Sequence, residues 1–254
     1  MLILEEKTFK DMPRYFVQLS FMGSGYHGWQ IQPNALSVQE VVEKAFSTIL
    51  GEEIQVVGAG RTDAGVHAKF FVLHFDCSQE IADFQKLIFR LNGFLPSDIA
   101  IQKIWEVLAD DHARFSAISR TYHYYITTVK NPFTFETAFY YSGKLDVDKM
   151  NETAAILLKT GDFTSFSRLH SDVKTNICKV YQSEWVAEGE RLIFKIRADR
   201  FLRNMVRAIV GTLLEVGKGK LSADDFRKII EMKDRGAAGA SAPAHALFLV
   251  DIEY

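Results

Sequence analysis

A carboxylate and a guanidinium, Asp63 and Arg61, lie in the glycine-rich run Gly58 to Ala68, GAGRTDAGVHA. Glycine reaches positive φ values and lets another backbone or a ligand approach closely, so this run predicts a shaped loop. A carboxylate can act as a nucleophile or a base, and a nearby guanidinium favours its ionised form. We therefore expect the loop to present Arg61 and Asp63 to a substrate. The alternative is a plain connection between two strands, in which Asp63 bonds backbone amides.

Local patterns place this loop within an N-terminal half. Residues Arg14 to Phe21 alternate in polarity as a strand does. Ser37-Val38-Gln39-Glu40 has the form of a capping box and is followed by apolar residues at helical spacing, which predicts a helix from Val38 to Leu50. The other elements expected here are strands at Ile54 to Val57, Phe70 to Asp76 and Ile99 to Val107, and a helix at Phe84 to Asn92. Their order is β-α-β-β-α-β.

The second half repeats this order. Strands are expected at Thr121 to Thr128, Lys179 to Val186, Leu192 to Ala198 and Leu247 to Ile252, and helices at Asp148 to Thr160, Phe201 to Val216 and Ala223 to Glu231. Two copies predict an α+β fold of two ferredoxin-like halves, with antiparallel-rich sheets flanked by helices and a cleft between them. We expect an N-terminal extension at 1–13, a half carrying the glycine-rich loop at 14–108, and a half carrying a tyrosine strand and an arginine helix at 109–254.

Two further groups of side chains could contact a substrate. Period-2 alternation puts Tyr122 and Tyr124 on one face of their strand, where ordinary core packing is the alternative role. On the helix expected at Phe201 to Val216, Arg200, Arg203 and Arg207 fall at i, i+3 and i+7 and predict an arginine-lined face. A solvated charged face is the alternative there.

The composition is that of a globular protein. The chain has 254 residues, of which 48% are hydrophobic and 24% charged, and its net charge is −2. This charge argues against binding nucleic acid through the overall field, so an RNA partner would need a local basic patch, for which Arg197 to Arg207 is the best candidate. The sequence has neither an apolar stretch of the ~20 residues that a membrane span needs nor a signal pattern, so we expect the cytoplasm.

Metal and cofactor motifs are missing from the sequence. The seven histidines lack ligand spacing, and His67 and His74 are expected to be ordinary loop and strand residues. Asp63 occupies the place where a dinucleotide-binding fingerprint has its third glycine. Cys77 and Cys178 have no Cys-x-x-Cys partner and are expected as reduced thiols. The sequence therefore predicts neither a metal nor a cofactor.

Three segments resemble the bacterial tRNA pseudouridine synthase A family. Gly60 to Ala68 is similar to its active-site signature, Arg114 to Tyr124 to its second motif, and Phe201 to Arg207 to its Phe-x-x-x-Met-Val-Arg segment. Gly23 to Gln30 and Asp162 to Phe166 resemble further fragments, so the similarity spans nearly the whole chain. A departure is Met22, where the family usually has an acidic residue, and it puts in doubt the RNA contacts of that loop.

The resemblance implies roles for particular residues. Asp63 matches the catalytic aspartate, Arg61 the arginine beside it, and Arg207 an arginine that points into the active site. Tyr122 matches the tyrosine that lies against the target base, whereas Tyr124 is expected to be structural. Arg200 and Arg203 are expected to contact phosphate. Tyr26 and Trp29 are expected to stack on RNA, with a place in the core as the alternative for Trp29.

The resemblance also implies the reaction and the partners. Family members isomerise uridine to pseudouridine at positions 38, 39 and 40 of the tRNA anticodon arm, and act as homodimers. The reaction has no net redox change and no group donor, so it needs no cofactor. The step that Asp63 performs stays open: attack on the sugar C1′, attack on the uracil ring, or removal of a sugar proton.

Two other functions would use similar residues. A noncatalytic RNA-binding module would use arginines and aromatic rings, but a carboxylate in its binding surface would repel phosphate. A glycosidase or nucleoside hydrolase would use an aspartate, but most sugar hydrolases need a paired carboxylate, and the motifs do not mark a second acid for that role. We therefore favour the isomerase.

Overall fold

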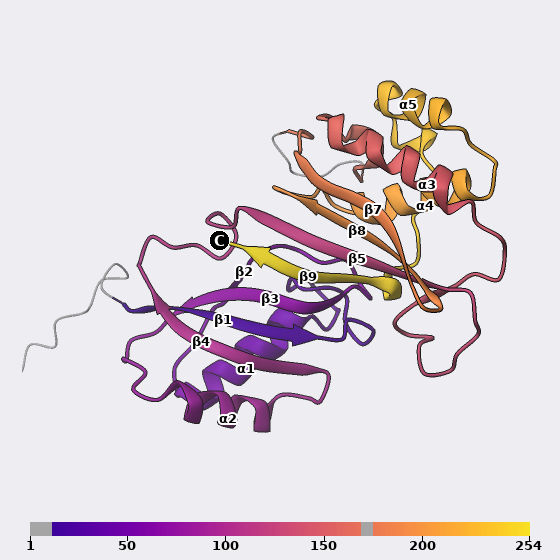
Figure 1. Cartoon of the computed structure of the whole chain (residues 1–254). Helices are drawn as coiled ribbons and strands as arrows, with labels where there is room; N and C mark the ends of the chain where they lie inside the picture. Colours follow the sequence, from indigo (N-terminus) through magenta and orange to yellow (C-terminus); the bar gives the residue numbers. More distant parts are fainter. Residues whose placement is uncertain (1–11, 169–174) are drawn as a thin grey trace, which may run out of the picture. The chain divides into compact units, whose positions relative to one another are not determined.

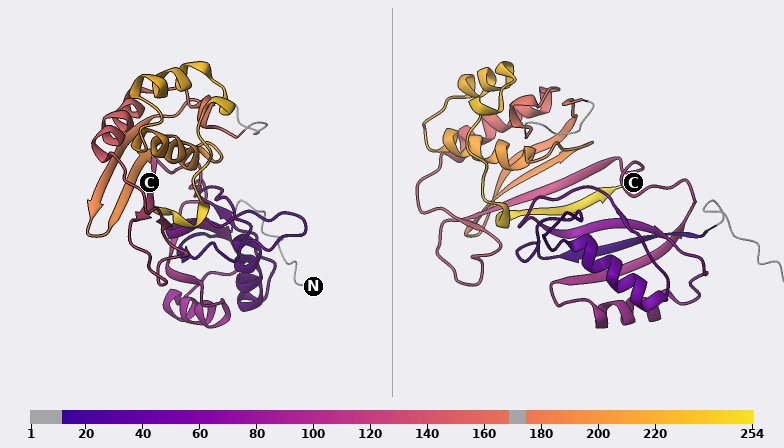
Figure 2. Two further views of the ribbon diagram at one scale, coloured as in Figure 1. Left: turned by 90° about the vertical axis from the view of Figure 1, so that its right-hand side faces the viewer. Right: turned by 180° about the vertical axis from the view of Figure 1, so that it is seen from behind.

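The computed structural model describes residues 12–168 and 175–254 and divides into two compact units (Figures 1 and 2). Unit 1 contains the chain up to Ala64 together with Ala68–Ala117, and unit 2 contains Gly65–His67 and Ile118–Tyr254. Residues 1–11 of the expected N-terminal extension lie outside the described residues.

Unit 1 is a sheet with helices on one face (Figure 1). Its elements are β1 (Arg14–Phe21), α1 (Val38–Leu50), β2 (Val57–Gly58), β3 (His67–Asp76), α2 (Phe84–Phe94) and β4 (Ile99–Val107). The sheet order is β4-β1-β3, with β2 on β3, and every pair is antiparallel.

The best-predicted elements of unit 1 follow from local sequence. On β1 the alternating residues Tyr15, Val17, Leu19 and Phe21 are all buried, as their period-2 spacing predicts. Helix α1 begins after Ser37, whose side chain accepts a hydrogen bond from the Glu40 amide, and ends at Gly51 in the left-handed conformation. These local signals therefore sufficed for both elements.

The strand expected at Ile54 to Val57 is wrong in extent, because β2 has two residues. The backbone N–H groups before it bond side chains of α1 instead of a neighbouring strand. The Ile54 amide donates to Ser47 Oγ at 2.9 Å, and the Val56 amide donates to Glu43 Oε1 at 3.0 Å. This segment consequently packs along α1 and joins the sheet only at Val57.

Unit 2 also has a sheet with its helices on one side (Figures 1 and 2). Its strands are β5 (Ser119–Thr127), β6 (Phe139–Tyr140), β7 (Val180–Glu188), β8 (Arg191–Ala198) and β9 (Leu247–Glu253). Its α-helices are α3 (Val147–Ala154), α4 (Met205–Gly217) and α5 (Ala223–Met232). The order is β9-β5-β8-β7 and is antiparallel, while the short β6 pairs in parallel with β5 and was not predicted.

The helix expected from Phe201 is shorter than predicted and differs in character. It begins at Met205, because Asn204 before it has φ 66°, a left-handed conformation that an α-helix cannot contain. Eleven of its residues are buried and only Arg207 and Glu215 are partly exposed, so α4 is a core helix without an arginine-lined face. The helix expected at Asp148 to Thr160 likewise ends early, at Ala154, and continues as a 3-10 helix over Ala155–Lys159.

Both units have the ferredoxin-like strand order. Counting the main strands of each unit along the chain, the order across the sheet is 4-1-3-2 in both cases. This confirms the predicted α+β class with mostly antiparallel sheets and flanking helices. Cys77 and Cys178 are both buried, and both are free thiols, as predicted.

Candidate active site

The start of the glycine-rich loop is fixed against unit 1 by close packing at Gly58. This residue pairs with Leu73 of β3, and the Ala59 amide donates to the Val72 carbonyl at 2.8 Å. A Cβ on Gly58 would meet the Trp29 indole Cε2 at 2.6 Å, so only glycine leaves room for that ring. Trp29 itself packs on Phe71, with 4.2 Å between ring centroids.

Gly28 supports the backbone next to Asp63. It has φ +89°, and a Cβ built on it would lie 3.2 Å from the Asp63 carbonyl carbon and overlap the Thr62 carbonyl oxygen. The Trp29 amide donates to that Thr62 oxygen at 3.4 Å. The loop around Gly28 therefore packs against the Thr62–Asp63 peptide and fixes its position, a role that the sequence did not indicate.

Arg61 and Asp63 differ in exposure. Arg61 is exposed, and among the described residues no hydrogen bond or ion pair engages its guanidinium. Asp63 is half-buried, next to the buried Thr62. The loop thus holds its carboxylate closer to the protein and leaves its guanidinium available to an anionic ligand.

The end of the same loop belongs to unit 2. Gly65 turns the chain with φ +78°, Val66 is buried in the main hydrophobic cluster of unit 2, and His67 is fully buried. Gly60, by contrast, has neither a positive φ nor any atom within 4 Å of a built Cβ. The predicted role of glycine is therefore confirmed at Gly58, by close approach of a side chain, and at Gly65, by its positive φ, whereas the protein itself imposes no such need at Gly60.

Tyr122 lies on β5 of unit 2, half-buried between its strand neighbours Ile196 and Leu249. Its ring and that of Phe201 form a T-shaped pair, with 5.1 Å between centroids and an interplanar angle of 85°. This contact restricts the orientation of the Tyr122 ring.

Tyr124 is buried two residues further along the strand, where burial raises the pKa of its hydroxyl and the Arg207 charge opposes that shift. Among the described residues its hydroxyl has no hydrogen-bond partner. Its complete burial agrees with a packing role.

Arg207 is fastened to the chain segment that precedes β9. Its Nε donates to the Ala242 carbonyl at 2.8 Å, and the Ala242 amide donates back to the Arg207 carbonyl at 2.9 Å. These two bonds orient the guanidinium at the first turn of α4.

The structure corrects the placement of Arg200 and Arg203. Both precede α4, so they do not share a helical face with Arg207. Arg200 is half-buried, and its amide donates to Asp199 Oδ1 at 2.7 Å, whereas Arg203 is exposed. Unit 1 therefore brings together Arg61 and Asp63, and unit 2 holds the other four predicted site residues.

Two aromatic residues considered for RNA stacking are core residues. Tyr26 is 6% exposed and Trp29 3% exposed. The Tyr26 hydroxyl donates to Asp98 Oδ1 at 2.8 Å, and burial raises its pKa. Trp29 packs against Gly58 of the glycine-rich loop, and Tyr26 is tied to Asp98.

The two histidines expected to be ordinary are both buried. Burial lowers the pKa of His67, and it lowers the pKa of His74 to about 4. His74 Nδ1 accepts a hydrogen bond from the Ala113 amide at 3.1 Å. Both rings therefore lie in the interior, and the Nδ1 atom of His74 is a hydrogen-bond acceptor there, which the local sequence did not indicate.

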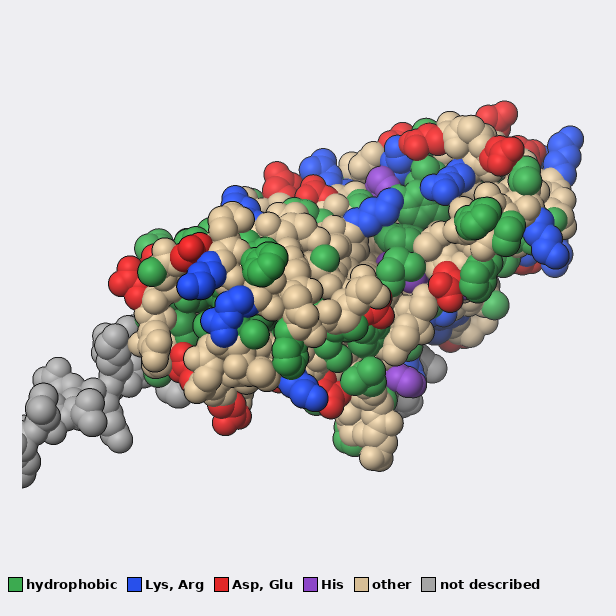
Figure 3. All heavy atoms as spheres, turned by 90° about the horizontal axis from the view of Figure 1, so that it is seen from below, with side chains coloured by type: hydrophobic (Ala, Val, Ile, Leu, Met, Phe, Trp, Pro, Cys, Tyr) green, Lys and Arg blue, Asp and Glu red, His purple; other side chains and the backbone are tan. Residues whose placement is uncertain are grey.

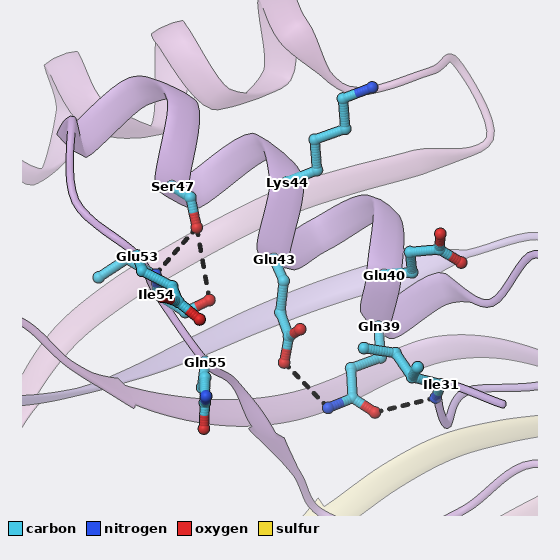
Figure 4. Close-up of a pocket in the computed structure, with 9 residues that line it drawn as sticks. All are labelled: Ile31, Gln39, Glu40, Glu43, Lys44, Ser47, Glu53, Ile54 and Gln55. Atoms are coloured by element: carbon cyan, nitrogen blue, oxygen red, sulfur yellow. Dashed lines mark hydrogen bonds between the residues drawn. The ribbon is translucent and has the colours of Figure 1, made fainter. Parts of the chain in front are cut away.

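A separate pocket of about 480 Å³ lies beside α1 in unit 1 (Figure 4). Its lining includes Glu40, Glu43 and Glu53 but a single lysine, Lys44. This charge would repel an RNA phosphate, and none of the predicted site residues lines the pocket. On the face drawn in Figure 3, basic side chains are interspersed with acidic ones.

Over residues 12–168 and 175–254, no group of three or more histidine, cysteine or acidic side chains is arranged to hold a metal ion. None of the helices in this described part is both long and apolar enough to cross a membrane.

Comparison with known proteins identifies the class to which this fold and loop belong. A family model described as tRNA pseudouridine synthase matches residues 19–116 and 154–254. The chain belongs to this family and is an enzyme, an isomerase.

Its relatives are similar over nearly their whole length. A tRNA pseudouridine synthase A from Bacteroides fragilis is 58% identical over 245 residues, which cover 96% of this chain and 97% of the relative. Those of Parabacteroides distasonis and Bacillus subtilis are 54% and 40% identical, over 96% and 93% of this chain and 96% and 97% of their own. The resemblance drawn from the motifs is thereby confirmed.

Proposed function

We propose that this enzyme converts uridine to pseudouridine at positions 38, 39 and 40 of the tRNA anticodon arm, with Asp63 as the essential carboxylate. The observation that carries the proposal is the moulded loop: Gly28 and Trp29 fix the Thr62–Asp63 peptide, and the loop presents a half-buried carboxylate beside an exposed guanidinium. The names of the relatives support tRNA as the substrate.

The reaction breaks the C1′–N1 bond of uridine, rotates the uracil, and joins C5 to C1′. The hydrogen on C5 leaves as a proton and N1 gains one, so atoms and electrons balance within the nucleotide. Asp63 provides the group that a covalent or base-assisted route needs, and the guanidinium groups of Arg61 and Arg207 are proposed to offset the charge of the RNA.

A uridine in the anticodon arm has to leave its stack before a carboxylate can reach it. Extrusion costs a few kcal/mol, which stacking on an aromatic ring offsets. Tyr122 suits this role because a T-shaped contact with Phe201 restricts the orientation of its ring, and the side chain remains partly exposed. Arg200 and Arg203 are proposed to contact phosphate.

Release of tritium from tRNA transcribed with C5-tritiated uridine tests the reaction, because the new C5–C1′ bond expels the C5 hydrogen. We expect release by the wild type and none by Asp63→Asn, which keeps the shape and removes the charge. Asp110→Asn is the matched control, since Asp110 is an exposed acid outside the loop. Full turnover by Asp63→Asn would overturn the assignment, and free uracil among the products would indicate a hydrolase.

Transcripts that keep a single uridine at position 38, 39 or 40 test the site specificity. Each should release tritium, and a transcript lacking all of them should release none. We also propose a cytoplasmic homodimer; light scattering coupled to gel filtration would contradict it by giving the mass of one 254-residue chain.

A further inference from the structure

The buried ring of His67 joins three chain segments of unit 2. Its Nε2 lies 3.0 Å from the Glu136 carbonyl oxygen and 2.9 Å from the His245 carbonyl oxygen. Both partners are acceptors only, so Nε2 must carry the hydrogen and donate to both. The end of the glycine-rich loop at residues 58–68, the signature loop, therefore meets the loop before β6 and the turn before β9 at one N–H group.

The ring is also held from the side. It stacks on Phe248 with 4.5 Å between centroids and an interplanar angle of 28°. Phe248 is 5% exposed and meets Tyr125 edge-on at 5.2 Å. His67 is 0% exposed, and this burial lowers its pKa and keeps the ring neutral.

The 238–246 segment, which carries His245, is the same one that holds Arg207. Ala242 exchanges two hydrogen bonds with Arg207, and Ala244 lies against Gly65, 3.4 Å from the position of a built Cβ. One short stretch of chain thus contacts both Arg207 and the end of the signature loop.

The 238–246 segment is itself rigidly attached to α4. The Gly239 amide donates to Thr212 Oγ1 at 3.0 Å, and the Ala240 carbonyl packs so closely on Gly211 that no Cβ fits there. Arg235 donates to the Gly239 carbonyl at 3.1 Å and to Ser241 Oγ at 2.8 Å. These contacts restrain the segment that carries the His245 carbonyl, one of the two that His67 bonds.

We propose that His67 is a positioning residue for the isomerisation, whose Nε2–H group fastens the signature loop to the segment that holds Arg207. The inference rests on the proposed function, because it assumes that Asp63 and Arg207 act in one reaction. Asp63 lies four residues before His67 in the chain, so movement at the anchor is passed along a short backbone to the carboxylate. Misplacing a reacting group by about 1 Å can cost on the order of 100-fold in rate.

Two variants separate the N–H group from the ring. His67→Gln loses the ring, but its amide N–H can occupy the place of Nε2. His67→Phe keeps a flat ring on Phe248 and leaves the two carbonyls without their donor. If His67 only fills space, Phe should be the better replacement; if it positions the loop, Gln should be.

We expect His67→Phe to lower kcat by about 100-fold at unchanged KM for tRNA, and His67→Gln to recover at least about tenfold of that loss. Rates are normalised to the folded fraction from urea unfolding. Equal normalised kcat for the wild type and the Phe variant would overturn the proposal, as would a Gln variant slower than the Phe variant.

Amide hydrogen exchange tests, without an activity assay, whether His67 holds the signature loop to the 238–246 segment. Exchange in residues 58–68 and 242–246 should rise in His67→Phe and stay close to the wild type in His67→Gln. Unchanged exchange in the Phe variant would overturn the inference even in an active enzyme. A wild type that releases no tritium would refute the proposed function, while the exchange comparison would still decide whether His67 holds the loop.

Discussion

Replacing Gly28 by alanine tests whether the loop around it fixes the position of the Thr62–Asp63 peptide. Gly28 combines φ +89° with direct contact to the Thr62–Asp63 peptide. A side chain there meets two separate penalties, backbone strain and steric overlap, and each has its own measurable consequence.

The strain lowers stability and the overlap lowers turnover. A non-glycine residue at positive φ costs about 1–2 kcal/mol. The added Cβ would lie 3.2 Å from the Asp63 carbonyl carbon and 3.3 Å from that of Thr62, and would overlap the Thr62 oxygen. To relieve this, the peptide must move on the order of 1 Å, which predicts about a 100-fold loss of kcat.

Gly51→Ala is the matched control. Gly51 has φ +76°, but no atom lies within 4 Å of its built Cβ, so this variant has the strain without the overlap. Urea unfolding should show a loss of about 1–2 kcal/mol in Gly51→Ala and a larger loss in Gly28→Ala, where the overlap adds to the strain. Single-turnover tritium release should fall only in Gly28→Ala; wild-type turnover in that variant, or an equal fall in Gly51→Ala, would refute the reasoning.

Three further predictions concern stability. Burial lowers the pKa of His74 from 6.5 to about 4, so the unfolded chain takes up the proton first; the contribution of neutral His74 is complete above pH 6.5 and is lost as the pH falls toward 4. When the pH falls from about 7 to about 5, the free energy of unfolding should decrease by about 2 kcal/mol more in the wild type than in His74→Asn. The asparagine amide oxygen can still accept the hydrogen bond from Ala113, and parallel pH profiles of the two proteins would contradict the prediction. Ser37→Ala removes the cap on the Glu40 amide and should cost about 1 kcal/mol in urea, an expectation that an unshifted midpoint would disprove. Phe46→Ala empties a fully buried site and should cost about 3–5 kcal/mol; a loss under about 1 kcal/mol would mean that the core refills it.

Elements with strong local signals could be predicted from sequence. The spacing of β1 and the Ser37 cap of α1 gave both elements their observed bounds, because alternation and capping act between near neighbours. The Arg61 and Asp63 loop was also visible, since few turns contain a carboxylate, a guanidinium and three glycines. Family membership followed from the motifs themselves.

Elements decided by competition between partners could not be predicted. The short β2 results from Ser47 and Glu43 taking amides that a strand would use, and the late start of α4 results from Asn204 at positive φ. Propensity and periodicity describe each residue's preference, but they do not say which hydrogen-bond partner is nearby once the chain has folded. The prediction of an arginine-lined helix was wrong for this reason, because the helix begins at Met205, after Arg200 and Arg203.

The sequence by itself determined the chemistry of the candidate site, and only the tertiary structure decided how that chemistry is held in place. Residue types and spacing identify Asp63 and Arg61, because reactivity belongs to the side chain. Residue types do not identify Gly28 and His67 as the residues that hold the loop. The contacts of His67 are distant in sequence, since 178 positions separate it from the carbonyl of His245. Burial and close approach between such distant segments exist only when the whole chain packs, so these residues acquire their role from the fold.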